Sequence, residues 1–284
     1  MIKRRYSNWD ELSILGFGGI LVDDTRASEA ERLVGLAIDS GINYFDVAPT
    51  YGNAEERLGP ALAAYRQSVF LACKTTERDG ERARSELESS LGKMRTDYFD
   101  LYQLHMMTTK DDFDQAVRPG GALETLIDAR DAGKIRHLGF SAHSVECALA
   151  LLEFFDFDSV LFPINWAMCL HGGFGPQVVE KAKEKGASVL ALKAMAYGKV
   201  REGGERPFAK LSYGPIMDPE LQDLALRFTL MQSVTAALPP GAQELFGQAI
   251  RIAEDFKPLS ENEVERLIML AKDPLAMFEL GAVI

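Results

Sequence analysis

The stretch Ile42-Asn43-Tyr44-Phe45-Asp46-Val47 decides the fold of this chain, because it is a short apolar run of the kind that forms a buried strand. An amphipathic helical stretch precedes it at residues 28–40, and the pair Ala48-Pro49 ends it. Similar apolar runs, each followed by a helical stretch, recur along nearly the whole chain. This alternation predicts parallel strands connected by helices.

Eight such runs qualify as strands. They are Leu12–Gly18, Ile42–Val47, Val69–Lys74, Phe99–Leu104, Arg136–Phe140, Ser159–Ile164, Val189–Lys193 and Val234–Leu238. Their mean repeat of about 32 residues fits a strand, a loop and a helix, and no Pro-, Gly- or Ser-rich linker divides the chain. We therefore predict an α/β fold, a (β/α)8 TIM barrel in one domain over residues 1–284, with residues 1–11 as an N-terminal appendage.

A doubly wound dinucleotide-binding sheet is the alternative fold. The first predicted strand ends in Gly16-Phe17-Gly18-Gly19, but the next glycine is distant and Asp23-Asp24 would repel a phosphate. The eight-unit pattern favours the barrel. In a barrel, residues 194–217 form a long irregular connection on the face where substrates bind.

Several helix ends are marked in the sequence. Ser28–Glu31 and Ser260–Glu263 have the spacing of capping boxes, and the second predicts a helix that runs to about Lys272. Gly41 is expected to stop the first helix. The pair Asp218-Pro219 reads as the N-cap and first residue of another helix.

The composition limits the classes of protein to consider. Of 284 residues 47% are hydrophobic, and 31 Lys and Arg stand against 42 Asp and Glu, a net charge of −11. This balance argues against nucleic acid or a membrane surface as a partner, but not against a local pocket for one phosphate. Cys73, Cys147 and Cys169 are too far apart for a metal or redox pair, so we expect reduced thiols and no metal site. No signal peptide or membrane-spanning run is present, which predicts a cytoplasmic protein.

Four polar residues stand at the ends of three consecutive predicted strands. Asp46 ends the second strand, and Tyr51 follows in the turn after it. Lys74 ends the third strand, and His105 follows the fourth. Barrel enzymes carry their active sites at the carboxyl ends of the strands, so these side chains should share one rim. Taken singly, each residue also has an ordinary structural interpretation. Asp46 could be a turn residue and Tyr51 an aromatic residue at the rim, while Lys74 could be a solvated charge and His105 a packed cap.

Together, the four side chains suit proton transfer to a carbonyl oxygen. A phenol has a pKa of about 10 and is a weak proton donor at neutral pH, whereas an adjacent ammonium favours its ionised form. A carboxylate would hold that ammonium in place and keep it charged. An imidazole can hydrogen-bond a substrate oxygen and orient it. The set predicts protonation of a carbonyl oxygen while a hydride arrives at its carbon.

Three longer segments carry a family resemblance. Gly41–Gly52 resembles the signature G-x-N-x-F-D-T-A-x-x-Y-G, Asp97–His105 resembles D-Y-x-D-L-Y-x-x-H, and Gly133–Ser141 is similar to G-K-I-R-x-I-G-x-S. These are signatures of the aldo-keto reductase family, which the chain resembles from about Leu12 to Leu270. The resemblance implies a (β/α)8 barrel closed at its base by an N-terminal hairpin. It also implies NADPH-dependent reduction of aldehydes and ketones, or the reverse oxidation.

The resemblance implies a role for each of the four rim residues. Tyr51 would be the general acid, and Lys74 would lower its pKa. Asp46 would anchor Lys74, and His105 would orient the carbonyl.

The same resemblance implies cofactor contacts. Gly18, Gly19 and Ile20 match the glycine-rich strand end beside the nicotinamide, where Asp46 also lies. Ser141 matches the serine that hydrogen-bonds the carboxamide, although Ala142-His143 follow where the family often has Asn.

The remaining cofactor positions depart from the family pattern. Asn165 either replaces a glutamine contact or caps its strand, and Lys193 stands where an aromatic residue or a Ser-Pro pair often packs on the nicotinamide. Gly241 forms a turn that could cradle a phosphate. No basic residue follows the eighth strand until Arg251, although NADPH-specific members place one there for the 2′-phosphate. We predict NADP as the cofactor, with NAD possible.

The predicted function is therefore that of a carbonyl reductase with a small-molecule carbonyl or alcohol substrate. We expect a monomer, with neither nucleic acid nor a membrane as partner. A cofactor-binding regulatory barrel with little or no turnover is the alternative. A cofactor-independent isomerase or lyase on the same barrel is the third interpretation.

Overall fold

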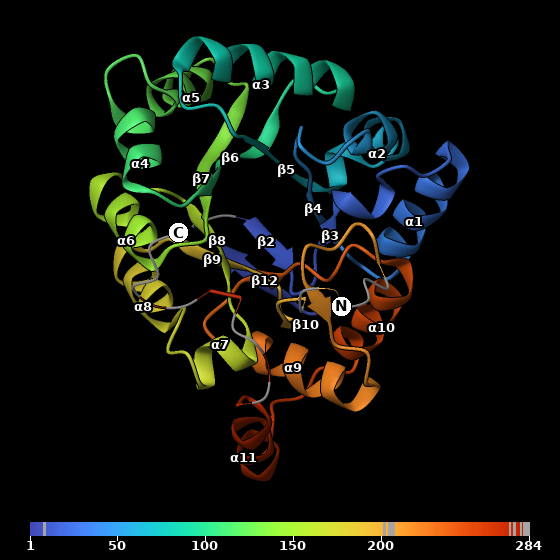
Figure 1. Cartoon of the computed structure of the whole chain (residues 1–284). Coiled ribbons are helices and arrows are strands. Elements are labelled where there is room, and N and C mark those ends of the chain that lie inside the picture. Colours follow the sequence, from blue (N-terminus) through green and yellow to red (C-terminus); the bar gives the residue numbers. More distant parts are fainter. Residues whose placement is uncertain are drawn as a thin grey trace.

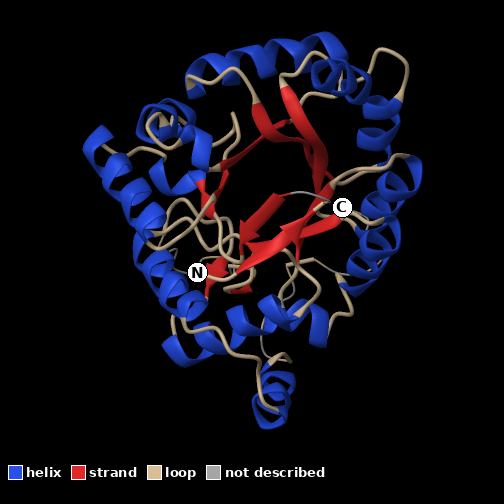
Figure 2. Cartoon of the chain, turned by 180° about the vertical axis from the view of Figure 1, so that it is seen from behind, coloured by secondary structure: helices blue, strands red, loops and turns tan. Residues whose placement is uncertain are grey.

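A ring of parallel strands with helices around it forms the centre of the computed structural model (Figures 1 and 2). The structure describes residues 1–7, 10–200, 203, 208–272, 274, 277–278 and 280. Within them, eight parallel strands follow one another in chain order. They are β3 (Phe17–Gly18), β4 (Tyr44–Asp46), β5 (Phe70–Thr75), β6 (Phe99–Met107), β7 (Ile135–Ala142), β8 (Ser159–Pro163), β9 (Ser188–Leu192) and β12 (Ala236–Ala237). The (β/α)8 prediction is confirmed.

The ring closes between β3 and β12, its first and last strands. A single parallel bridge joins Leu15 to Ala237. The Gly16 amide donates a hydrogen bond to the Ala237 carbonyl at 3.0 Å, and the Ala237 amide donates to the Ile14 carbonyl at 2.9 Å. We call this bridge with its two hydrogen bonds the seam of the barrel.

Helices form the outer layer of the barrel (Figure 2). They are α1 (Ala27–Asp39), α2 (Ala54–Leu62), α3 (Gly80–Met94), α4 (Lys110–Val117), α5 (Ala122–Asp131), α6 (Val145–Phe154), α7 (Trp166–Leu170), α8 (Pro176–Lys185), α9 (Pro219–Met231), α10 (Gln243–Glu254) and α11 (Glu261–Leu270), with 3-10 turns η1 (Gly19–Val22) and η2 (Arg66–Ser68). Of these, α11 projects from the body of the barrel (Figure 1).

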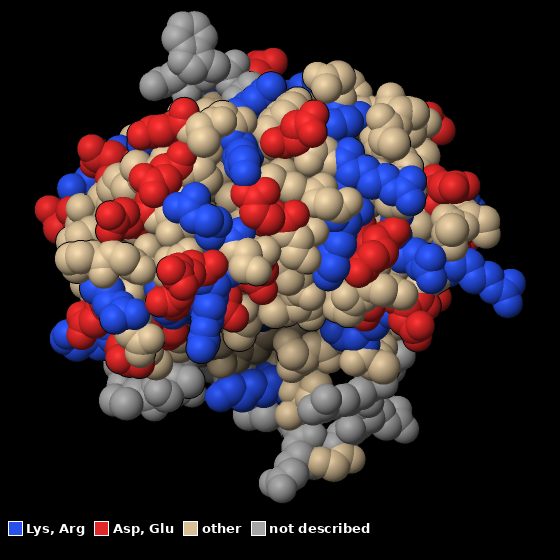
Figure 3. Space-filling model, turned by 90° about the horizontal axis from the view of Figure 1, so that it is seen from above, with Lys and Arg blue, Asp and Glu red and all other residues tan. Residues whose placement is uncertain are grey.

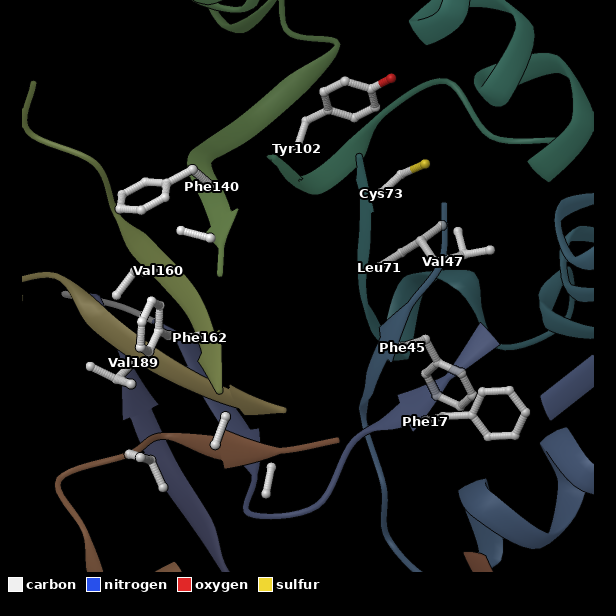
Figure 4. Close-up of a cluster of buried hydrophobic side chains, with 14 of the residues drawn as sticks. Phe17, Phe45, Val47, Leu71, Cys73, Tyr102, Phe140, Val160, Phe162 and Val189 are labelled. Carbon is white, nitrogen blue, oxygen red and sulfur yellow. The ribbon is translucent and has the colours of Figure 1, made fainter. Parts of the chain in front are cut away.

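Several barrel strands contribute to two cores, because successive side chains of a strand point to opposite faces. On β5, Leu71 and Cys73 belong to the large apolar cluster shared with the helices, and Figure 4 shows residues of this set around the strands. The alternate residues Phe70 and Ala72 belong to a smaller cluster with residues from strands around the ring. That smaller cluster therefore fills the barrel interior.

An N-terminal hairpin of β1 (Lys3–Tyr6) and β2 (Asp10–Ser13) plugs the base of the barrel. The Tyr6 side chain has no exposed surface, and its ring centroid lies 4.8 Å from that of Phe70 inside the barrel. Its hydroxyl donates a hydrogen bond to Ser159 Oγ at 3.0 Å. The hairpin implied by the family resemblance is thus present, and it closes the end of the barrel that lies away from the strands' carboxyl ends.

Two predicted segments need correction. The first predicted strand, Leu12–Gly18, is two pieces: its beginning belongs to the hairpin strand β2, and only β3 belongs to the barrel. The chain must turn between the base plug and the ring, so one continuous strand cannot serve both. The connection at residues 194–217 is not wholly irregular, because β10 (Ala196–Gly198) and β11 (Gly214–Pro215) pair antiparallel in it. Gly204 and Pro207 of that connection lie outside the described residues.

The predicted helix ends are confirmed with one exception. Asp218 caps α9, and Ser260–Glu263 form the predicted capping box of α11, which ends at Leu270. Gly41 follows α1 with a φ of +78°. The Ser28–Glu31 prediction is wrong: Arg26 is the N-cap residue of α1 and makes no side-chain cap. The helix starts at Ala27, which places Ser28 inside the first turn rather than before it.

Charged side chains of both signs are interspersed over the face seen in Figure 3. Among the described residues, no helix combines the length and the apolar character needed to cross a membrane.

We predict that the base plug stabilises the fold. Tyr6→Ala should lower the free energy of unfolding by about 3–5 kcal/mol, because it leaves a cavity where a large side chain is fully buried. Tyr6→Phe removes only the hydroxyl and should cost about 0.5–1.5 kcal/mol. Urea unfolding followed by circular dichroism measures both. Lys3→Ala, on the exposed part of the same hairpin, is the control, and equal effects for Lys3 and Tyr6 would contradict a plug.

Candidate active site

The interior face of three neighbouring strands brings the predicted rim residues together. Asp46 ends β4 and Lys74 lies near the end of β5, each two residues beyond a residue of the interior cluster, so both point into the barrel. Gln103 occupies the corresponding interior position on β6, opposite Lys74, and His105 follows two residues later and lines the cavity. Tyr51 follows β4 in a turn that includes Gly52, whose φ of +53° is a conformation that suits glycine.

Lys74 and Asp46 form a buried ion pair. Their side chains are 0% and 1% exposed, and the Lys74 ammonium donates to Asp46 Oδ2 and, at 3.1 Å, to the Val47 carbonyl. The Gln103 amide donates to the other Asp46 oxygen at 3.1 Å. Sequence reasoning assigned no role to Gln103, although it lies two residues before His105 and therefore on the same strand face.

Tyr51 lies over this pair. The Lys74 ammonium is 5.2 Å from the centroid of the phenol ring, and the ring stands nearly perpendicular to that of His105 at 6.0 Å between centroids. Burial raises the pKa of the Tyr51 phenol, and the Lys74 charge acts against that effect. The net shift is upward, so the expected lowering by Lys74 is outweighed by burial here. The phenol therefore keeps its proton at neutral pH.

His105 is held neutral. Burial, helped by the Lys74 charge, lowers the pKa of its imidazole from 6.5 to about 2. Its Nδ1 is buried and has no hydrogen-bond partner among the described residues. The neutral ring also lines the cavity described next, where it can hydrogen-bond a ligand.

A cavity of about 410 Å³ opens above these residues. Its walls include all four predicted catalytic residues, Asp46, Tyr51, Lys74 and His105. Of the predicted cofactor residues, it is lined by Gly18, Ile20, Asp46, Ser141, Lys193 and Gly241. Gly19 and Asn165 are not among the lining residues.

The lining suits a flat ligand that approaches the backbone closely. A Cβ on Gly18 would come no nearer than 4.0 Å to another described heavy atom, so its missing side chain leaves open space in the wall. A Cβ on Gly241 would collide with Ile20, which requires glycine there. The Ser141 hydroxyl accepts a hydrogen bond from the Met106 amide at 2.8 Å and keeps its own proton to donate. These groups fit the amide-bearing ring and phosphates of a nicotinamide cofactor.

The side-chain oxygen and nitrogen of Asn165 both form hydrogen bonds with backbone groups of the fold. Its Oδ1 accepts from the amides of Ala167 and Met168 at the start of α7. Its Nδ2 donates to the carbonyls of Lys193 and Ala196 at 3.0 and 2.8 Å. Of the two interpretations left open by the sequence, this geometry favours the capping role.

Lys193 and His143 form a second polar group in the cavity wall. Lys193 Nζ lies 3.1 Å from His143 Nε2 and 4.6 Å from the centroid of the Phe278 ring. Burial lowers the pKa of His143 to about 3 and that of Lys193 to about 8. The sequence singled out Lys193 alone, because His143 follows the end of β7 in a bend, where spacing along the chain does not decide the side on which a residue lies.

Two further cations come from segments that the sequence did not link to the site. Lys210, in the connection before β11, lines the cavity and donates to the Asp23 carbonyl. Arg32 of α1 donates to the Gln243 side chain at 3.1 Å, at the start of α10. Nothing in the local sequence indicates either position, because both arise from chain segments that meet only in the folded barrel.

A metal site has no candidate in the described part of the chain, where no three His, Cys, Asp or Glu side chains are placed to hold an ion.

A family model and several known proteins are similar to this chain. A family model described as "Aldo/keto reductase family" matches residues 14–267. The aldo-keto reductase YhdN of Bacillus subtilis is 36% identical over 149 residues, which cover 48% of this chain and 43% of that protein. The 6-dehydroglucose reductase of Novosphingobium aromaticivorans is 31% identical over 145 residues, covering 45% of this chain and 46% of that protein. The matched regions span a little less than half the length of these curated relatives.

Solved structures extend the likeness in fold to nearly the whole chain. The holo form of the aldo-keto reductase AKR11C1 from Bacillus halodurans superposes with a TM-score of 0.74 at 23% identity, covering 97% of this chain and 98% of that one. The thermostable aldo-keto reductase Tm1743, in complex with the inhibitor epalrestat, gives 0.70 at 18% identity, covering 95% and 100%.

We predict that Asp46 is required to keep Lys74 buried. Asp46→Asn should lower the free energy of unfolding by about 3–5 kcal/mol, the usual effect of removing one partner of a buried ion pair. Urea unfolding measures this loss. The double variant Asp46→Asn/Lys74→Met removes both charges and should be more stable than the single variant. An Asp46→Asn protein as stable as wild type would contradict the interpretation.

We also predict that neither His105 nor His143 titrates between about pH 5 and 8. The unfolded chain protonates an imidazole at about its ordinary pKa of 6.5, so these two residues destabilise the fold as the pH falls below that value. Long-range ¹H–¹⁵N NMR spectra report the charge of each ring, and the variants His105→Gln and His143→Gln assign the signals. A midpoint near 6.5 for either ring would refute the neutral assignment.

Proposed function

The chain belongs to the aldo/keto reductase family, and from this premise we propose that it is an oxidoreductase. It reduces an aldehyde or ketone to an alcohol with hydride from a nicotinamide cofactor, or catalyses the reverse oxidation. The observation that carries the proposal is the buried Lys74–Asp46 pair beneath the protonated Tyr51, beside a neutral His105 in one cavity.

The proposal assigns a role to each of the four polar residues in the cavity. The cofactor supplies a hydride to the carbonyl carbon when it is bound. Tyr51 gives its phenolic proton to the carbonyl oxygen, and hydride and proton together complete the alcohol. Lys74 stabilises the phenolate that remains, and Asp46 keeps Lys74 charged in a buried position. The neutral His105 hydrogen-bonds the same oxygen and orients the carbonyl.

We propose NADP as the cofactor, with NAD as the alternative. The turn at Gly241 and the exposed start of α10 offer backbone amides to a phosphate. The cation absent from the sequence after β12 is supplied by Arg32, which reaches Gln243 from α1. Its guanidinium is also paired with Glu29, so its contribution to a 2′-phosphate should be moderate.

The proposal keeps the wider expectations of the sequence: one domain, a monomer, a cytoplasmic location, and a small-molecule carbonyl or alcohol as the substrate. A regulatory barrel with little turnover is less well supported, because the complete set of proton-transfer residues is assembled in the cavity.

We predict that Tyr51→Phe lowers kcat/KM for reduction of a generic aromatic aldehyde by at least about 100-fold, because a positioned general acid contributes about 10²–10⁴-fold. Absorbance of NADPH or NADH at 340 nm follows the reaction. Tyr65→Phe, which deletes a hydroxyl from an exposed tyrosine away from the cavity, is the control. Full activity of Tyr51→Phe would rule out the mechanism. Tight cofactor binding without turnover on a broad panel of aldehydes would favour the regulatory barrel.

Arg32→Gln should raise the dissociation constant of NADPH about three- to tenfold and leave that of NADH nearly unchanged, since only NADPH carries the 2′-phosphate. Fluorescence titration measures both constants. Arg251→Gln, an exposed residue later on α10, is the matched control. Equal effects of Arg32→Gln on the two cofactors would show that Arg32 does not contact the 2′-phosphate.

A further inference from the structure

The described lining of the cavity carries more positive than negative charge, although the whole chain has a net charge of −11. Asp46 is the one carboxylate among the described lining residues, and it is already paired with Lys74. Lys193 and Lys210 also line the cavity, and neither forms an ion pair with a carboxylate in the part of the chain that the structure describes. An anionic group on a ligand would balance the excess positive charge of this lining.

Lys193 is held in place at the end of β9. Its backbone adopts a φ of +64°, unusual for a residue with a side chain, and its carbonyl accepts a hydrogen bond from Asn165 at 3.0 Å. Beside it, the ring of His143 stacks on Phe278 at 5.0 Å between centroids and 9° between planes. The position of the ammonium is therefore set by three chain segments that are distant in sequence.

His143, the hydrogen-bond partner of the Lys193 ammonium, does not neutralise the positive charge of that ammonium. His143 is neutral, so its Nε2 can accept one of the three Lys193 protons at 3.1 Å. Apart from the Phe278 ring at 4.6 Å, the ammonium has no further partner among the described residues, so its other two protons and its positive charge remain for a ligand. Because burial disfavours the charged form of Lys193, a bound anion would offset a real desolvation penalty.

The group lies close to the proposed reaction centre. Lys193, His143 and His105 line the same cavity, and the Lys193 charge is near enough to His105 to help lower the pKa of that imidazole. Lys210 differs, because it is an exposed residue whose ammonium is bonded to the Asp23 carbonyl. Lys193 is thus the cation best placed to meet a substrate whose carbonyl is held by His105.

From this geometry we infer that Lys193, with His143, binds a carboxylate on the substrate, so that the favoured substrates are keto acids or aldehydes bearing an acid group. The inference rests on the proposed function, because it assigns the substrate class of the same site. A phosphate of the cofactor is the other anion that Lys193 could bind, and the experiment distinguishes it from a substrate carboxylate.

The test compares 4-carboxybenzaldehyde with its neutral methyl ester, methyl 4-formylbenzoate. Wild type should reduce the acid with a kcat/KM at least about tenfold higher, the usual range for a charge-assisted hydrogen bond. Lys193→Met should remove that preference, and Lys193→Arg should retain most of it. Lys210→Met is the contrasting variant and should keep the preference, because the inference places the carboxylate on Lys193. Thermal unfolding checks that every variant is folded.

The preference is a ratio, so a change in cofactor affinity cancels from it. An acid preference that survives in Lys193→Met overturns the inference, and a raised NADPH dissociation constant in that variant would assign Lys193 to a cofactor phosphate instead. If neither these two aldehydes nor the broad panel is turned over, the proposed function fails and the binding of a carboxylate at Lys193 is still testable. Ligand-observed NMR then compares benzoate with benzamide: tighter benzoate binding that Lys193→Met abolishes supports the carboxylate site, and equal binding overturns it.

Discussion

An ammonium group buried in the mouth of a barrel is the constraint on which the rest of this site depends. Lys74 has no exposed surface, and a charge in such a place is tolerated only beside an opposite charge with its hydrogen bonds satisfied. Asp46 meets that requirement from the neighbouring strand, and Gln103 satisfies the second oxygen of the carboxylate. Tyr51 then lies above a fixed positive charge. Burial makes the ion pair costly in desolvation free energy. The same burial keeps the Tyr51 phenol protonated and the His105 imidazole neutral, as the proposed carbonyl reduction requires.

Strand periodicity explains why so much of this could be predicted from the sequence. Apolar runs repeating along the chain define a parallel barrel, and the carboxyl end of each run is then on one rim. The alternation of side chains decides which residues at that rim face inward, so Asp46, Lys74 and His105 could be placed together without knowing any distance. The same alternation also places Gln103 inside, although its residue type suggested no role in the sequence.

The features that escaped prediction depend on contacts between distant segments. Arg32 reaches the start of α10, and Phe278 stacks on His143, yet no local pattern links either pair. Asn165 shows the opposite problem: its position suggested a ligand contact, but two backbone amides and two carbonyls of the fold take up its hydrogen-bonding groups. The misplaced cap at Ser28 arose because a two-residue shift in the start of α1 exchanges an N-cap for an ordinary helical position.

The seam gives the barrel an intrinsic line of weakness. β3 and β12 are two residues long, and among the described residues one bridge with two backbone hydrogen bonds joins the ends of the ring, so little backbone pairing resists opening there. The cavity is lined by Gly18 and Ile20 on one side of the boundary and by Leu238 and Gly241 on the other. A molecule bound in the cavity contacts residues on both sides of the seam and so links them. Ligand occupancy and the cohesion of the barrel are therefore thermodynamically linked: whatever fills the cavity also strengthens the join between the first and last strands.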